Sequence, residues 1–403
     1  MLHTVSQFFS VLLRPSYSRH RVGGPATRSR IAALAALACA FAAAPPAQAG
    51  SAGMQRALDT LVAAEGGPVG ASTLIQRGRR VEFLRAGAAD LRTGRAFHRS
   101  DQMRIASIAK AFSGAVALSL VDRGALELDD TLGEMLPSSP SQWSQVTLAQ
   151  LMRHTSGIPS YIESRQFAED FSADTRRYFS PEELVAYVAD EPLGFPPGSA
   201  YAYSNTDNIL IGLIAEATTG RVYENDLRQL VYRPLGLEHT NLPSDWLLPR
   251  RFIHGYDAPD EGEPPEDLSE LISASGAWAS GGIVSTPLDL NRFIRGYVGG
   301  DLFGPRVRRG QFDFVPGCGQ PPGPGECSSG LSVYRYRTDC GTVFGHSGNF
   351  PGYSQFAAST KDGRRSVVVS VNQAHNGEED TPVFRLVFEA YESAVCAALA
   401  PRG

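Results

Sequence analysis

The stretch MRIASIAKAF, residues 103–112, places a serine and a lysine three positions apart among small and apolar residues. On a helix, positions i and i+3 share a face, so the side chains of Ser107 and Lys110 can touch. Lysine is rare here, because Lys110 and Lys361 are the only two in the chain. An apolar setting lowers the pKa of a lysine, and a neutral amine can activate a neighbouring hydroxyl. The pair predicts a nucleophilic Ser107, although this spacing also occurs by chance.

Two later segments carry residues that would complete such a site. In YAYSNTDN, Tyr203 and Asn205 precede an expected helix. A phenol can exchange protons with a nucleophile and an amide can position a carbonyl, although the triplet could also simply cap the helix. In FGHSGNFPGY, His346, Ser347 and Gly348 close an expected strand, whose small residues would let a substrate backbone pair alongside. Each segment is weak evidence alone, and the three together in this order are specific.

Other chemistry is less well supported. GHSG resembles the G-x-S-x-G elbow of other esterases, but Asn349 replaces the second glycine and a turn follows instead of a helix. His154, in RHTSG, could be a triad base, yet a histidine at the end of an expected helix is ordinary as a cap. The eight histidines are scattered, and neither CxxC nor HExxH occurs. We therefore expect neither a metal nor a cofactor.

The N-terminal segment has the layout of a secretory signal. Residues 1–30 carry five arginines, residues 31–44 are almost purely apolar, and the small residues Ala47 and Ala49 follow. The apolar run is shorter than the roughly 20 residues that span a bilayer core. We predict a signal peptide over 1–49, cleavage after Ala49 and a secreted or extracytoplasmic protein. A retained membrane anchor and a lipid-modified Cys39 are the alternatives.

The remaining chain, residues 50–403, is long enough for a large core in one composite domain or two. No second long apolar stretch occurs, so we expect no membrane span in the mature protein. The net charge of −5 and the lack of a basic patch argue against a nucleic-acid partner. We expect a monomer that acts on a small substrate.

The order of expected elements predicts an α+β fold. Helical spacing or capping signals are found at 51–64, 107–122, 146–154, 206–220, 285–297 (with Ser285 as its cap) and 381–399. Strand patterns are found at 72–76, 81–87, 331–337, 342–348, 353–359 and 366–372, and 316–330 is a loop by composition. We therefore expect one antiparallel sheet from both ends of the chain (about 50–112 and 285–403), flanked by helices, and an inserted helical lobe (about 113–284).

These segments resemble the penicillin-recognising serine hydrolases, whose members use an SxxK serine, a Tyr-x-Asn triplet and a Lys/His-Thr/Ser-Gly strand. The chain looks closest to the serine-type D-alanyl-D-alanine carboxypeptidases, relatives of class C β-lactamases. The stretches GALELDD (124–130), LMRHTSGIPSY (151–161) and SGGIVSTPLDL (280–290) extend the resemblance over most of the mature chain. It implies a β-lactamase/transpeptidase-like fold, in agreement with the order of strands.

The resemblance also implies catalytic roles. Ser107 would be the acylated nucleophile, with Lys110 and Tyr203 as its proton network and Tyr203 as the preferred base. Asn205 would hold the substrate amide oxygen, and His346 would support the proton network.

Further residues would bind the substrate. The backbone N–H groups of Ser107 and of Asn349, which follows Gly348, would form an oxyanion hole. Ser347 would contact a terminal carboxylate together with Arg335, for which Arg337 is the alternative. Trp278 would be either a pocket aromatic or a core residue.

Four cysteines follow Ala49, and an even number in an exported chain indicates disulfides, with three pairings open. The resemblance implies a bond between Cys340 and Cys396. Cys318 and Cys327 would then close a loop of their own, which the resemblance does not cover.

The activity that this comparison favours is that of a carboxypeptidase acting on peptidoglycan-type peptides that end in D-alanine. A class C-like β-lactamase and a small-ester esterase or D-aminopeptidase are the enzymatic alternatives. A penicillin-binding sensor that is acylated without turnover is the alternative outside enzymes.

Overall fold

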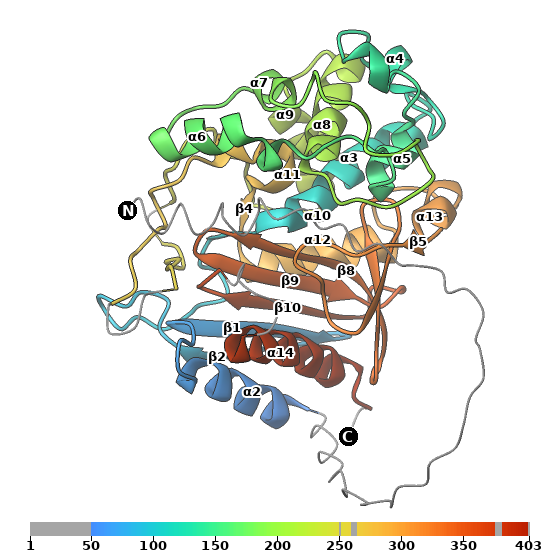
Figure 1. The fold of residues 1–403 in the computed structure, drawn as a ribbon. Helices are drawn as coiled ribbons and strands as arrows, with labels where there is room; N and C mark the ends of the chain where they lie inside the picture. The colour runs from blue at the N-terminus through green and yellow to red at the C-terminus, as the bar shows by residue number, and fades with distance from the viewer. Residues whose placement is uncertain (1–49, 250, 259–263, 375–380, 402–403) are drawn as a thin grey trace, which may run out of the picture.

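The computed structural model describes residues 50–249, 251–258, 264–374 and 381–401. Its main sheet is antiparallel, with the strand order β2-β1-β10-β9-β8-β7-β6-β5 (Figure 1). The N-terminal hairpin supplies β1 (Gly70–Arg77) and β2 (Arg80–Gly87), and the C-terminal part supplies the rest. Strand β10 (Arg365–Val371) pairs with β1 and with β9 (Tyr353–Ser359). The two ends of the chain therefore meet inside one sheet, as the sequence predicted.

Helices cover both faces of this sheet. Helices α2 (Ser51–Ala63) and α14 (Pro382–Leu399) pack against each other and against the outer face at β1, β2 and β10. Helix α12 (Pro287–Gly299) packs on the opposite face against β9 and β10. The almost continuous burial of β10, which is rich in β-branched valine, suits a strand that is covered on both sides.

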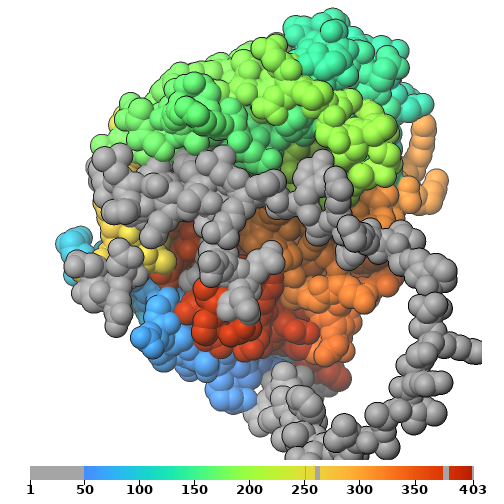
Figure 2. Space-filling view, in the orientation of Figure 1, coloured from blue at the N-terminus to red at the C-terminus, as the bar shows by residue number. Residues whose placement is uncertain are grey.

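The inserted lobe lies above the sheet and forms the green upper half of the molecule (Figure 2). Its helices are α3 (Ala109–Asp122), α4 (Leu132–Met135), α5 (Leu148–Arg153), α6 (Arg165–Ala173), α7 (Pro181–Ala186), α8 (Asn205–Thr219), α9 (Tyr223–Leu227), α10 (Arg233–Leu235) and α11 (Trp278–Gly281). Every residue of α3 from Ala109 to Leu120 is buried, as expected for a helix that is apolar on all sides. Helix α8 packs beside it, so these two helices form the centre of the lobe.

Two predicted details are wrong. The cap of α12 is Thr286, whose hydroxyl accepts a hydrogen bond from the Asp289 N–H, whereas Ser285 belongs to the short strand β4 (Val284–Ser285). Residues 316–330 are not entirely loop, because β5 (Val315–Pro316) begins the segment and β6 (Glu326–Ser329) pairs with β7 (Tyr334–Thr338). The glycines and prolines of this segment lie outside β6, so they do not interrupt its pairing.

Both expected disulfides are present. Cys340, at the turn between β7 and β8 (Gly341–Phe350), is bonded to Cys396 of α14. Cys318 is bonded to Cys327 and closes the loop before β6. Among the described helices, none combines the length and the apolar character needed to cross a membrane. The predicted signal peptide, 1–49, lies outside the described residues.

Candidate active site

The Ser107 side chain lies where the sheet meets the inserted lobe. Ser107 belongs to a single turn of 3-10 helix, Ala106–Ile108, which leads directly into α3. The preceding residue, Ala106, has φ = 54°, in the left-handed region that residues other than glycine rarely adopt. Such strain is often found at functional sites, and here it lies immediately before the predicted nucleophile. Ser107 is 8% exposed, so it is buried but reachable.

Lys110, one turn later, is fully buried and its amine has three acceptors. The Nζ atom lies 2.7 Å from Asn205 Oδ1, 2.8 Å from the Ser280 carbonyl oxygen and 3.2 Å from Ser107 Oγ. The amide and carbonyl oxygens can only accept, whereas the hydroxyl can accept or donate. An amine that has lost one proton would keep both shorter bonds and direct its lone pair at Ser107.

The pKa of Lys110 supports that proton arrangement. Burial lowers the pKa of Lys110 well below its ordinary value, and the nearby Asp207 carboxylate partly opposes this effect. Both groups lie in the interior, because Lys110 is 1% and Asp207 0% exposed. The amine is therefore easier to deprotonate than that of a lysine in water.

Helix α8 begins at Asn205, and the first residues of the helix are fixed from two sides. The backbone N–H and the side-chain amide of Asn205 both donate to Ser160 Oγ, at 3.1 and 3.2 Å. One turn farther along, Ser113 Oγ of α3 donates to Asn208 Oδ1 at 2.7 Å. Two polar contacts, Lys110–Asn205 and Ser113–Asn208, therefore join α3 to α8 and set the position of the amide beside the amine.

Tyr203 completes the group that the sequence predicted around Ser107. Its ring centre lies 4.9 Å from the Nζ atom of Lys110. Within the described residues, its buried hydroxyl has no partner at hydrogen-bonding geometry. Burial raises the pKa of Tyr203 above its ordinary value, and the neighbouring Ser107 hydroxyl opposes the rise. The phenol is therefore protonated near neutral pH and is available as a proton donor.

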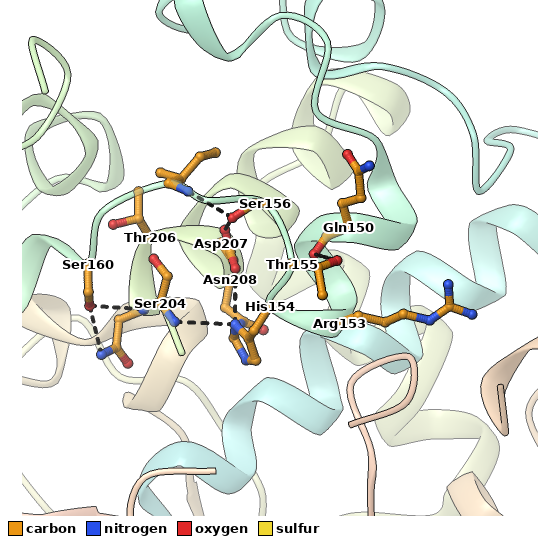
Figure 3. Close-up of polar contacts among 12 residues, drawn as sticks. Gln150, Arg153, His154, Thr155, Ser156, Ser160, Ser204, Thr206, Asp207 and Asn208 are labelled. Atoms are coloured by element: carbon orange, nitrogen blue, oxygen red, sulfur yellow. Dashed lines mark hydrogen bonds and ion pairs between the residues drawn. The ribbon is translucent and has the colours of Figure 1, made fainter. Parts of the chain in front are cut away.

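A buried network behind Tyr203 was not found by sequence reasoning (Figure 3). His154 Nδ1 lies 3.0 Å from Asp207 Oδ2, and Ser156 Oγ donates to Asp207 Oδ1 at 2.6 Å. The His154 ring centre is 4.6 Å from that of Tyr203. Burial raises the pKa of Asp207 well above its ordinary value and lowers that of His154. His154 ends α5 in a left-handed conformation, so the expected capping position is correct, but its side chain points into this network.

Strand β8 forms the other wall of the site. Its pairing with β7 stops at Gly345, whereas its pairing with β9 continues to Phe350. One edge of residues 346–350 therefore has no strand partner in the described part of the chain. A Cβ atom on Gly348 would lie 2.6 Å from the Ser107 backbone nitrogen, so only glycine permits this close approach. Asn349 follows in the same half of the strand.

His346 lies on this wall and is 1% exposed. Burial lowers the pKa of His346 to about 3, and its hydrogen bond with the Ser347 carbonyl opposes this shift. The imidazole is therefore neutral near neutral pH. The positive charge of a protonated Lys110 also lowers the pKa of His346.

The remaining predicted residues are less directly connected to Ser107. Ser347 Oγ donates to the Pro321 carbonyl oxygen at 2.6 Å. The Arg335 guanidinium lies 4.7 Å from the centre of the Phe314 ring. Trp278 donates from Nε1 to Glu224 Oε1 at 3.3 Å.

The indole of Trp278 packs within the helical lobe. Its ring lies 5.0 Å from that of Tyr223, and a Cβ on Gly212 would meet it at 2.6 Å. Of the two expected roles, these contacts favour that of a core residue. The backbone two residues after Trp278 does contact the site, because the Ser280 carbonyl oxygen accepts a hydrogen bond from Lys110. Among the described residues, no group of three or more His, Cys, Asp or Glu side chains could hold a metal ion.

The sheet with its inserted helical lobe and the Ser-Lys pair at their junction define the class of β-lactamase and transpeptidase folds. The family model described as Beta-lactamase matches residues 54–392. The chain belongs to this family of serine hydrolases.

Comparisons with individual proteins agree with this assignment. Penicillin-binding protein 4* of Bacillus subtilis (strain 168) is 25% identical over 351 residues, which cover 83% of this chain and 71% of the relative. The D-aminopeptidase of Cereibacter sphaeroides (strain KD131) is 30% identical over 209 residues, covering 51% of this chain and 39% of that protein.

Solved structures show the same fold over most of the chain. A D-stereospecific amidohydrolase from Streptomyces sp. is 29% identical with a TM-score of 0.72, covering 84% of this chain and 97% of that one. The D-amino acid amidase of Ochrobactrum anthropi SV3 has a TM-score of 0.76 at 24% identity, covering 85% and 97%.

Proposed function

We propose that this protein is a D-stereospecific serine amidohydrolase that works through an acyl-enzyme on Ser107. The observation that carries the proposal is the contact of the Lys110 amine with Ser107 Oγ at 3.2 Å, inside a site where burial lowers the pKa of that lysine. A deprotonated amine at this distance can take the hydroxyl proton as Ser107 attacks the substrate carbonyl.

We propose one role that differs from the assignment made from the sequence. Tyr203 was the preferred base, but its raised pKa makes the phenol a poor proton acceptor at neutral pH. We assign the base to Lys110 and the donation of a proton to the leaving nitrogen to Tyr203. Asn205, held by Lys110 and Ser160, would position the substrate amide.

The oxyanion of the tetrahedral intermediate needs donors on the strand side of Ser107. The close approach of Gly348 to the Ser107 nitrogen supports an oxyanion hole made of the backbone N–H groups of Ser107 and Asn349. The open edge of β8 would pair with the backbone of the substrate.

The preference for D-amino-acid substrates is supported by the names of the similar proteins, which include a D-stereospecific amidohydrolase and a D-aminopeptidase. The second candidate is the D-alanyl-D-alanine carboxypeptidase suggested by the sequence. The neutral, buried His346 and the similarity to penicillin-binding protein 4* favour it.

Trapping the acyl-enzyme tests the proposal. Incubation with a p-nitrophenyl ester of a short acid, followed by rapid acid quench and peptide mass spectrometry, should place the acyl group on Ser107. Ser107→Ala should show neither the adduct nor turnover. Ser119→Ala is the matched control, because this serine is buried on α3, which follows the turn that carries Ser107, and donates to the Ala115 carbonyl. An acyl group on another serine would refute the assignment.

The lifetime of the adduct and the turnover of several substrates separate an enzyme from a sensor. A penicillin-binding sensor would form a lasting adduct with benzylpenicillin and would turn over neither D-amino-acid amides, nor peptides ending in D-alanine, nor p-nitrophenyl esters. A β-lactamase would release the penicillin product quickly.

We also propose export, with a signal peptide that is removed after Ala49. The two disulfides support it, because such bonds persist in oxidising compartments. Expression of the full chain in a bacterium, followed by mass measurement of the mature protein, should find Gly50 at its N-terminus. An intact N-terminus in the exported fraction would contradict the cleavage site.

A further inference from the structure

The disulfide-closed loop between β5 and β6 lies against the candidate site. Cys318 and Cys327 close it, and the mechanism above gives it no role. Two hydrogen bonds connect the loop to the two walls of the site. From the strand wall, Ser347 Oγ donates to the Pro321 carbonyl oxygen at 2.6 Å. From the helical side, the Tyr201 hydroxyl donates to the Cys318 carbonyl oxygen.

The loop is in close contact with tyrosine rings on both sides. A Cβ on Gly317 would lie 2.2 Å from the ring of Tyr201, and one on Gly323 would lie 2.2 Å from the ring of Tyr336. The Tyr201 hydroxyl is also 3.0 Å from that of Tyr334 on β7. The glycines allow the backbone to approach the rings this closely. The loop is therefore packed between the lobes, against Tyr201. This tyrosine precedes Tyr203 by two positions in the chain.

This packing engages Ser347, one of the groups that would recognise a terminal carboxylate. A carboxylate accepts hydrogen bonds and needs donors, but the hydroxyl of Ser347 already donates to Pro321. The carbonyl oxygen beside it is itself an acceptor with partial negative charge. The guanidinium of the predicted partner Arg335 lies over the Phe314 ring, 4.7 Å from its centre. Placing a carboxylate here would remove it from water without supplying the hydrogen bonds that compensate.

We propose that the loop closed by Cys318 and Cys327 determines substrate class by rejecting leaving groups that carry a terminal carboxylate. The substrates are D-amino-acid derivatives with uncharged leaving groups, chiefly primary amides and C-terminally amidated peptides. This inference rests on the proposed Ser107 acyl-enzyme and sharpens it, because it selects the amidase over the carboxypeptidase.

The reaction balances with water as the only other reactant. Ser107 Oγ bonds to the carbonyl carbon, and its proton passes to Lys110. The carbon–nitrogen bond breaks, and the nitrogen takes a proton from Tyr203 and leaves as ammonia or an amine. Lys110 returns its proton to Tyr203. Water then hydrolyses the ester, which releases the carboxylic acid and restores the Ser107 hydroxyl.

A matched pair of peptides tests the proposal. The pair is an N-acetylated peptide ending in D-alanyl-D-alanine and the same peptide with its C-terminus amidated, so only the carboxylate differs. We expect kcat/KM for cleavage of the last peptide bond to be at least about tenfold higher for the amidated peptide. Equal rates, or a faster reaction of the free carboxylate, would overturn the proposal.

Loop variants test the cause of the preference. In Cys318→Ala/Cys327→Ala, the ratio of the two kcat/KM values should fall toward one, because the loop can move away from Ser347. The control, Cys340→Ala/Cys396→Ala, loses a disulfide between α14 and the turn before β8 and should keep the native ratio.

Tyr201→Phe provides a second test if the loop variant does not fold. It removes the hydroxyl that holds Cys318 and should lower the ratio in the same direction by a smaller factor. If the double cysteine variant folds and keeps the native ratio of the two kcat/KM values, the role of the loop is refuted. If that variant does not fold, an unchanged ratio in Tyr201→Phe refutes it. If the p-nitrophenyl ester left no acyl group on Ser107 of the native protein, the proposed function itself would be refuted. A failure of the loop proposal can therefore be distinguished from a failure of the proposed function.

Discussion

The helical wall and the strand wall of the site are built in opposite ways. On the helical wall, Lys110, Asn205 and Asp207 are buried and bonded to fixed partners on α3, α5 and α8 or beside them. On the strand wall, the pairing of β8 with β7 stops at Gly345, and a separate loop contacts Ser347. The comparison teaches that the polar groups of the helical wall are held by fixed partners, whereas the proposed basis of substrate choice is a strand end and a loop.

The largest expected effect comes from the helical wall. Lys110→Arg should lower the rate of acylation by about a thousandfold or more, because a guanidinium does not release its proton at neutral pH. The pre-steady-state burst of p-nitrophenol measures this rate. Lys361→Arg is the control, since the only other lysine is exposed at the turn between β9 and β10 and should leave the burst unchanged. Near-normal acylation by Lys110→Arg would show that this amine is not the base.

A smaller but still large effect is expected from the strand wall. Gly348→Ala should reduce kcat by about a hundredfold, because the added methyl group would push β8 away from the Ser107 nitrogen and disturb the oxyanion hole. Gly310→Ala is the control, as its Cβ would meet only side chains at ordinary contact distances. If the burst and kcat of Gly348→Ala match the native values, the two walls do not meet at Ser107 as described.

The charge behind the helical wall should shift the pH profile without abolishing activity. Activity requires neutral Lys110, so it is present above the pKa of this lysine and lost as the pH falls through it. The carboxylate of Asp207 raises that pKa. Asp207→Asn should therefore move the acidic limb of kcat/KM to lower pH, by about one unit or less.

Asp226→Asn is the matched control for this shift. Asp226 is equally buried, and its carboxylate accepts hydrogen bonds from Thr219 and Arg221 at the C-terminal end of α8. The acidic limb of the kcat/KM profile of Asp226→Asn should stay at the native position. A limb that moves to higher pH in Asp207→Asn would contradict the assigned electrostatics.

The smallest effect concerns His346. Because burial lowers its pKa to about 3, the imidazole should stay neutral between pH 5 and 8. Its ring proton resonances, assigned by comparison with His346→Asn, should show no titration over that range. A midpoint near the ordinary value of 6.5 would mean that the strand wall, unlike the helical wall, changes its charge at working pH.

Much of the arrangement was predictable, because its signals are local. The three-residue spacing of Ser107 and Lys110, the β-rich runs at both ends of the chain and the even cysteine count each follow from short stretches of sequence. The resemblance then supplied the pairing of Cys340 with Cys396, which the structure confirms. Local patterns also placed the start of α5, where Thr147 forms the capping box.

What could not be predicted depends on contacts between distant residues. His154 and Asp207 are 53 positions apart, and nothing local indicates that they meet. The acceptor for Lys110 at Ser280 is a backbone carbonyl, which any residue type could supply. Ser285 and Thr286 are equally good caps by type, so only the backbone path could distinguish them. The indole of Trp278 likewise turned into the core for reasons that its sequence neighbours do not show.

The position of β10 has a consequence for biosynthesis. This strand lies between β1 and β9, so segments far apart in the sequence must be present together before the sheet can form. Pairings across such long sequence separations form slowly. A ribosome-bound or truncated chain that lacks β10 would have no continuous sheet beneath Ser107, so we expect the candidate nucleophile to be inactive until β10 has been synthesised.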